Sequence, residues 1–172
     1  MPAILFLNNK DINVLLVKKK IEIERPINEV YDFATNMENF GSWFPEVIKI
    51  ESHNNLDHGV VGKKYLETVK DPFKGEIQIV LEVKKADSCS SFVTEGDYPP
   101  LLPKMTIQFL ETSKGSTELS WAMESRSKSF LIRISMIQLA KIIMRKRAKK
   151  GVLNLKNLLE NGKIYRNRTP HC

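Results

Sequence analysis

The alternation of apolar and polar residues begins with one clear strand. In residues 14–24, VLLVKKKIEIE, Ile21 and Ile23 fall on one side while lysines and glutamates fall on the other. A two-residue period of this kind is typical of a β-strand with one buried face. We therefore predict a first strand that ends near Glu24.

Two short helices are predicted next. Pro26 has the fixed φ that suits the first turn of a helix, and apolar residues follow it at helical spacing, which favours a helix over residues 26–35. Asn36 is placed to cap a second short helix and Gly41 to end it. Pro45 then disfavours helix for the residue before it.

The rest of the chain shows a series of hairpins followed by one long helix. Strand patterns recur at residues 47–52, 63–70, 76–85, 88–96, 104–112 and 117–125. The turn sequences DPFKG and TSKGS separate two pairs of these strands. Alternating sides within the strands predict an antiparallel sheet with one solvated face. A continuous helical stripe follows at Met144, Ala148, Val152, Leu155 and Leu159.

Together these elements predict an α+β fold in which a curved antiparallel sheet of about seven strands wraps around a long C-terminal helix, with two short helices after the first strand. The chain of 172 residues is 42% hydrophobic and 27% charged, which is ordinary for one globular domain. We expect that domain over residues 1–162 and a flexible tail over residues 163–172, after a helix-stopping Asn-Gly.

The order of these motifs resembles the START-like, or SRPBCC, superfamily, and in particular its polyketide cyclase/dehydrase branch. The first strand is followed by Pro26, by Val-Tyr-Asp-Phe at residues 30–33 and by Trp-Phe-Pro at residues 43–45. GSTELSW at 115–121 and LKNLLE at 155–160 are similar to the superfamily's late strand and terminal helix. The resemblance covers nearly the whole chain and implies the helix-grip fold.

In that superfamily the sheet and the final helix enclose a deep, largely apolar cavity, so the resemblance implies a protein that binds a hydrophobic small molecule or lipid. A strongly curved sheet is not filled completely by one helix, and methionine side chains adapt to varied ligands. Core packing is the alternative role for each candidate. The ligand-cavity residues that we expect are Trp43, Tyr65, Glu67, Ile79, Leu81, Met105, Ile107, Phe109, Trp121, Met123, Leu139, Met144, Ala148 and Val152.

Glu67 is the one acidic residue among these candidates. If its strand keeps its alternation, Glu67 shares a face with Tyr65, and a carboxylate near a phenol could assist acid/base chemistry on a bound carbonyl compound. The alternative places Glu67 near the rim or in an ion pair with a lysine such as Lys104. We assign no catalytic residue; in an enzyme of the polyketide cyclase kind, the candidates would be Tyr65, Glu67 and Thr94.

A net charge of +7 favours a negatively charged partner surface. Exposed leucines in the proline-rich loop at 95–103, beside the basic run at 144–150, would suit docking on an anionic bilayer, where each basic residue adds ~1 kcal/mol. A solvated helix face is the alternative, and nucleic acid is disfavoured because the basic run contains no aromatic residue. The membrane-contact residues on this hypothesis are Leu101, Leu102, Arg145, Lys146, Arg147, Lys149 and Lys150.

Apolar side chains cover nearly the whole circumference of the helix predicted over residues 130–144. One face would pack on the sheet. Ile132, Met136, Leu139 and Ile143 on another face would need a partner, such as a second copy in a homodimer. The pattern leaves open whether residues 127–140 form a separate lid.

Other chemistry finds little support in the sequence. Cys89 and Cys172 form neither a disulfide framework nor a metal motif, and the three histidines lack a second ligand at metal spacing, so we expect no metal and no cofactor. We also find no export signal and no membrane-spanning segment. These features favour a cytoplasmic protein, with peripheral membrane contact as a further hypothesis.

Three functions therefore stand side by side. The first is binding or transport of a hydrophobic small molecule or lipid between the sheet and the final helix. The second is an enzyme of the polyketide cyclase or aromatase kind that uses the same cavity. The third is a protein-interaction module that buries the outer apolar face of the long helix.

Overall fold

The computed structural model describes residues 13–113 and 115–162, apart from the side chains of residues 130, 133 and 134. Its helices are α1 (Ile27–Thr35), the 3-10 helix η1 (Met37–Ser42) and α2 (Phe130–Asn161). Its strands are β1 (Val14–Ile23), β2 (Val47–Ser52), β3 (Lys64–Asp71), β4 (Gly75–Asp87), β5 (Ser91–Asp97), β6 (Pro103–Ser113) and β7 (Ser116–Ser125).

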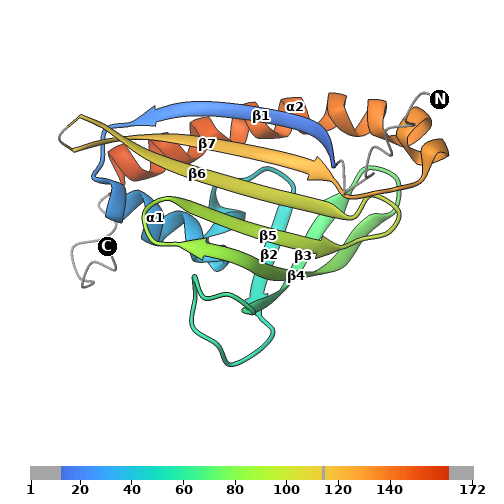
Figure 1. Ribbon diagram of the computed structural model, residues 1–172, viewed down its shortest axis with the longest axis horizontal. Coiled ribbons are helices and arrows are strands. Elements are labelled where there is room, and N and C mark those ends of the chain that lie inside the picture. The colour runs from blue at the N-terminus through green and yellow to red at the C-terminus, as the bar shows by residue number, and fades with distance from the viewer. Residues whose placement is uncertain (1–12, 114, 163–172) are drawn as a thin grey trace, which may run out of the picture.

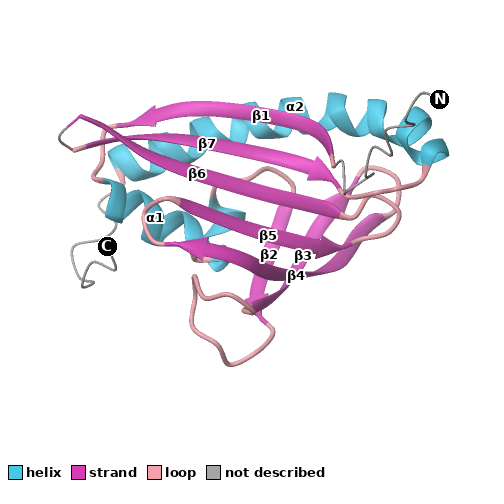
Figure 2. Cartoon of the chain, viewed as in Figure 1, coloured by secondary structure: helices cyan, strands magenta, loops and turns pink. Residues whose placement is uncertain are grey.

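The seven strands form one antiparallel sheet in the order β1-β7-β6-β5-β4-β3-β2 (Figure 1). The sheet curves, and α1 and α2 lie behind it in this view (Figure 2). This arrangement confirms the predicted α+β helix-grip fold, including the two short helical segments after β1. α2 runs unbroken from Phe130 to Asn161, so residues 127–140 do not form a separate lid.

The C-terminal half of α2 is fastened to β1 and to the residues just after it. Lys156 donates a hydrogen bond from Nζ to the carbonyl oxygen of Glu22 at 2.7 Å. The guanidinium of Arg25 donates from Nε to the carbonyl oxygen of Leu159 at 2.9 Å. Buried Ala148, Val152, Leu155 and Leu159 belong to the hydrophobic core beneath this half of the helix. These contacts fix where α2 lies, and so how far its other half stands from β3 and β4.

Aromatic side chains of η1 and the turn after it fill the space next to α2. The ring of Phe44 stacks on Phe40 with centroids 4.8 Å apart and lies 5.0 Å from the Trp121 ring. A Cβ added at Gly151 would lie 2.8 Å from Cδ2 of Phe44, which is closer than carbon atoms normally approach. Glycine at this position therefore lets α2 approach the aromatic cluster.

One expectation about cysteine is wrong. The wide spacing of the two cysteines predicts no disulfide, yet Cys89 is disulfide-bonded in the structure. Cys172 lies outside the described residues, as does the predicted tail at 163–172. The cysteines therefore give no support to a reducing compartment. Among the helices that the structure describes, none has both the length and the apolar content needed to cross a membrane.

The substitution Gly151→Ala tests the close approach of α2 to Phe44. Alanine improves helix propensity by about 1 kcal/mol, but overpacking a buried ring costs about 1–3 kcal/mol. We expect the free energy of unfolding in urea to fall by about 1 kcal/mol. Lys149→Ala, at an exposed position of the same helix, should change it little. A clear gain of stability in Gly151→Ala would show that the helix does not press on the ring.

Candidate functional site

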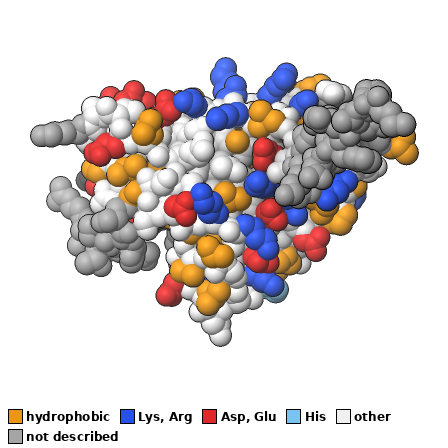
Figure 3. Space-filling model, viewed as in Figure 1, with side chains coloured by type: hydrophobic (Ala, Val, Ile, Leu, Met, Phe, Trp, Pro, Cys, Tyr) orange, Lys and Arg blue, Asp and Glu red, His pale blue; other side chains and the backbone are white. Residues whose placement is uncertain are grey.

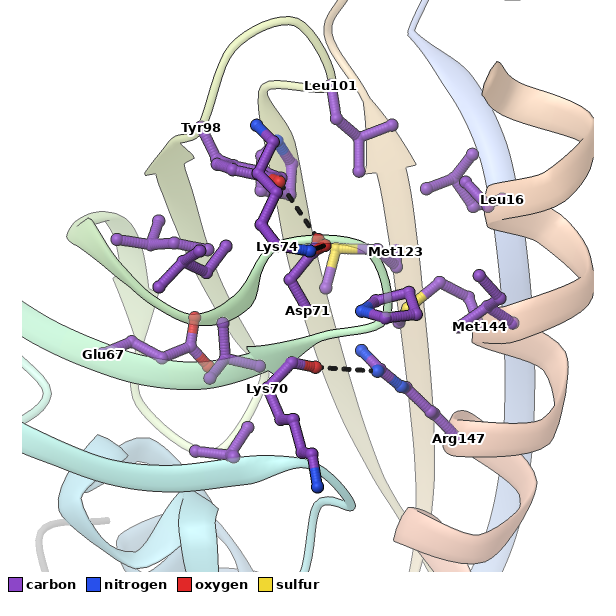
Figure 4. A pocket seen from close by; sticks show the side chains of 18 of the residues that line it. Leu16, Glu67, Lys70, Asp71, Lys74, Tyr98, Leu101, Met123, Met144 and Arg147 are labelled. Carbon is purple, nitrogen blue, oxygen red and sulfur yellow. Dashed lines mark hydrogen bonds between the residues drawn. The ribbon is translucent and has the colours of Figure 1, made fainter. Parts of the chain in front are cut away.

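A cavity of about 350 Å³ lies between α2 and the half of the sheet that contains β3 and β4. The β3–β4 turn and the loop between β5 and β6 border it on the sheet side, and α2 borders it on the other (Figure 4). Its volume is at the lower end of the range for small-molecule sites. The apolar side chains that line it include Leu16, Phe44, Val69, Ile77, Ile79, Met123, Leu139, Ile143 and Met144.

Glu67 is the acidic side chain on the wall formed by the middle of β3. It alternates with Tyr65 and Val69 toward the inner face of the sheet and is paired across the ladder with Ile79. The side chain keeps partial accessibility because it faces the cavity, while protein atoms surround the cavity itself. Within the described part of the chain, no hydrogen bond or ion pair reaches its carboxyl group.

Removal from water determines the protonation of Glu67. Desolvation raises the pKa of its carboxyl from the ordinary 4.5 to about 7, against an opposing effect of the Arg147 charge. Neutral and charged forms are therefore both populated near neutral pH. A carboxyl group in this state can donate or accept a hydrogen bond, or transfer a proton, when a ligand enters.

Arg147 faces Glu67 from α2 across the cavity (Figure 4). Its guanidinium donates a hydrogen bond from Nη2 to the carbonyl oxygen of Lys70 at 3.0 Å, which links α2 to the end of β3. The side chain is half-buried, so Arg147 is part of the cavity wall. The sequence-based placement of Arg147 with the exposed basic residues does not describe its contacts here.

A polar bridge joins the two sheet loops beside the cavity. The hydroxyl of Tyr98 donates to the Asp71 carboxylate at 3.0 Å, and the Lys74 ammonium lies 5.1 Å from the centre of the Tyr98 ring. Asp71 also accepts from the backbone N–H groups of Phe73 and Lys74, which shapes the β3–β4 turn. This turn leaves the Phe73 side chain 72% exposed at the edge of the cavity.

Five of the expected cavity residues line this cavity: Glu67, Ile79, Met123, Leu139 and Met144. The others are packed in the core and do not line it: Trp43, Tyr65, Leu81, Met105, Ile107, Phe109, Trp121, Ala148 and Val152. Their strands cross the part of the sheet that α1, η1 and the C-terminal half of α2 fill. Core packing, the alternative considered for each of them, is where the structure places these nine.

Tyr65 does not join Glu67 in the cavity. Its hydroxyl lies 3.0 Å from Nδ1 of His58, in the loop between β2 and β3, and its side chain is fully buried. Burial raises the pKa of the Tyr65 phenol to about 12. Thr94 is also buried and does not line the cavity. Lys104, considered as a partner for Glu67, lies 3.6 Å from Glu124 instead.

The expected membrane-contact residues differ in exposure. Arg145, Lys146, Lys149 and Lys150 are exposed on α2, whereas Leu101 and Leu102 are half-buried and Leu101 lines the cavity. Sequence reasoning missed Phe73, because it treated DPFKG only as a turn. An aromatic residue at the tip of a hairpin turn, where packing does not require it, was the available signal.

The exposed face of the N-terminal half of α2 also differs from the expectation. Met136 and Leu139 are 45% and 44% exposed, as expected for that face, but both border the cavity. Ile132 and Ile143 are half-buried, and Ile143 lines the cavity; Leu131 and Ile142 are the exposed residues instead, at 76% and 58%. The helix is rotated so that the stripe expected to be outward turns partly toward the cavity.

Comparison with known proteins identifies related sequences and folds. A model of CoxG, a family described as a subunit of carbon monoxide dehydrogenase, matches residues 20–159. No curated protein matches significantly. A solved structure from Thermus thermophilus has a TM-score of 0.66 at 13% identity and covers 86% of this chain and 98% of its own.

Two further solved structures share the fold. A protein from Nitrosomonas europaea has a TM-score of 0.63 at 16% identity, with 87% of this chain and 96% of that chain covered. The di-domain ARO/CYC StfQ of the steffimycin biosynthetic pathway has a TM-score of 0.62 at 11% identity, with 88% of this chain and 50% of that chain covered. At these identities the likenesses show the fold alone.

The raised pKa of Glu67 predicts a specific dependence of stability on pH. Between pH 4.5 and about 7 the folded state holds a proton on Glu67 that the unfolded state has released, so the free energy of unfolding falls as pH rises and levels off above pH 7. The total change is up to about 3 kcal/mol, from 1.36 kcal/mol for each pKa unit. Glu67→Gln should lack this component.

The measurement is urea unfolding of both proteins at pH 5 and pH 7.5. The histidines titrate in both proteins, so the difference between the two pH profiles isolates Glu67. Parallel profiles for wild type and Glu67→Gln would contradict the assignment of a buried, raised-pKa carboxyl group.

Proposed function

The chain belongs to the CoxG family, a family of the SRPBCC type, and on this premise we propose that it binds and transports a hydrophobic small molecule or lipid. The ligand would occupy the cavity between α2 and the β3–β4 side of the sheet. One observation carries the proposal: an apolar cavity of about 350 Å³ has a partnerless carboxyl group, within the described residues, on its wall.

The lining determines what kind of ligand fits. Apolar ligand surface buried in the cavity would contribute ~25 cal/mol per Å², before the costs of association. Glu67 and Arg147 would receive a polar group at one end of the molecule. An amphiphile, with a hydrophobic body and one hydrogen-bonding group, satisfies both parts of the wall.

Contact with a membrane would give such a ligand a route into the cavity. Phe73, Met136 and Leu139 expose apolar surface at the cavity border, and Arg145 and Lys146 are exposed on the same helix. Insertion of the apolar groups into an anionic bilayer, with basic residues at the headgroups, would bring the cavity to the lipid. We therefore propose a cytoplasmic protein that touches the membrane surface transiently.

The second candidate function is catalysis of the polyketide cyclase or aromatase kind. The titration of Glu67 near neutral pH favours it, because a general acid or base works best with a pKa near the working pH. The fold shared with StfQ, named as an ARO/CYC protein, adds a precedent for such chemistry. On this hypothesis Glu67→Gln would abolish turnover of a poly-carbonyl substrate while binding persists; the first hypothesis involves no turnover.

The third candidate is a protein-interaction module. The family's description as part of a dehydrogenase favours a protein partner, and the exposed side chains of Leu131 and Ile142 on α2 would supply apolar contact area. A second copy bound through residues 130–144 would appear as a dimer in size-exclusion chromatography with light scattering.

Ala140→Trp tests the binding proposal directly. Ala140 is half-buried on α2 and lines the cavity, so an indole there would occupy the space meant for a ligand. We expect the affinity for the neutral fluorescent probe N-phenyl-1-naphthylamine to fall at least about tenfold, since the probe loses its apolar contacts. Gln138→Trp, on the exposed side of the same turn, is the matched control and should bind the probe normally.

The outcome against the proposal is equal probe binding by wild type, Ala140→Trp and Gln138→Trp. That result would mean that the probe binds the outer surface. Circular dichroism of each variant verifies the fold before binding is compared.

Flotation with lipid vesicles tests the membrane contact. For phosphatidylglycerol vesicles, the double substitution of Lys149 and Lys150 by glutamine should weaken binding by about 2 kcal/mol, since each basic residue adds ~1 kcal/mol. Phe73→Ser should also weaken binding, whereas Leu153→Ser, an exposed leucine on the C-terminal half of α2, should not. Unchanged flotation of the lysine variant would support the alternative of a solvated helix face.

A further inference from the structure

A second hollow, of about 410 Å³, lies on the face of the sheet opposite α2. Figure 3 looks onto this outer face, where basic side chains border an area of uncharged surface. The residues that line the hollow come from β1, β4, β6 and β7 and from the start of β5. It is separate from the cavity beneath α2, because the sheet lies between them.

Strand register shows how the floor of this outer groove is built. Lys20 pairs with Ser120, Ser120 with Gln108, and Gln108 with Ser91, which makes one polar row across four strands. The neighbouring row runs from Lys18 through small or uncharged residues to Lys85 on β4. The row therefore has a lysine at each end, and the four strand spacings between them amount to roughly 19 Å.

Ser120, at the centre of the floor, has an unsatisfied hydroxyl group. The residue is 6% exposed, and its Oγ has no hydrogen-bond partner among the residues that the structure describes. Its register partners Lys20 and Gln108 have long side chains that flank it on either side. A buried hydroxyl without a partner is unfavourable, and a ligand that moves these side chains aside would satisfy it.

The lysines around the floor are available to an anion. Lys18 makes no ion pair with any described residue, while Lys20 pairs with Glu118 and Lys85 with Asp87, each at 2.7 Å. Both pairs are largely solvent-exposed, and such pairs contribute little, so the lysines can turn to another anion. The hydroxyl of Ser91 already donates to Asp87 at 3.1 Å, which places a second serine at the β4 end of the groove.

We propose that the outer groove binds a small phosphate-bearing molecule, with Ser120 and Gln108 donating hydrogen bonds to its oxyanion and the surrounding lysines balancing its charge. The two lysine-bearing ends suit a ligand with more than one anionic group. The groove is a separate site from the hydrophobic cavity, and its ligand is a separate, polar molecule.

The test is an NMR titration of the ¹⁵N-labelled chain with inorganic pyrophosphate, at an ionic strength held constant with sodium chloride. We expect amide shifts centred on Ser91, Gln108 and Ser120. Ser120→Ala and Lys18→Gln should each weaken binding at least about threefold, because each removes one contact. Lys149→Gln removes an exposed charge on α2 and should leave the affinity unchanged. Ala140→Trp, which fills the hydrophobic cavity, should leave it unchanged too, so the two proposals can fail independently.

Three results would overturn the proposal. Shifts spread evenly over basic residues, or affinities equal to wild type in both Ser120→Ala and Lys18→Gln, would indicate an adventitious ion only. Shifts at the groove with phosphatidic acid vesicles but none with soluble pyrophosphate would assign the surface to a bilayer and overturn the small-molecule ligand.

Discussion

The attachment of α2 to β1 determines the rest of the site. Lys156 and Arg25 hydrogen-bond the C-terminal half of the helix to the strand edge, and the leucines beneath that half are buried. The sheet then curves away through β6, β5 and β4, so one helix cannot contact all seven strands. Short helices and their aromatic residues fill one end of the resulting space. The other end, between β3 and the N-terminal half of α2, remains as the cavity.

The composition of this remaining space indicates function better than the fold does. Side chains that merely complete a core would be apolar throughout, since a buried carboxyl group without a partner is costly. Glu67 nevertheless stands on the cavity wall with a pKa near 7, opposed by the charge of Arg147. A ligand with a polar end would relieve that cost, and the exposed Phe73 and Leu139 at the border suit a ligand that arrives from an apolar environment.

Much of the fold follows from local patterns, whereas the site depends on long-range packing. Alternation in residues 76–85 predicts which side of β4 is buried, and Asn36 does cap η1 as its position indicates, because these features involve near neighbours. Alternation also places Tyr65 and Glu67 on one face. It cannot reveal that the β2–β3 loop covers Tyr65 with His58 while leaving Glu67 open to the cavity.

The direct test of the account is a crystal structure of the protein purified without added ligand. The account predicts that the cavity between β3 and α2 persists and holds continuous density that extends from the carboxyl group of Glu67 toward Phe73. A cavity closed by inward movement of Met136, Leu139 and Met144, with no space left beside Glu67, would contradict it.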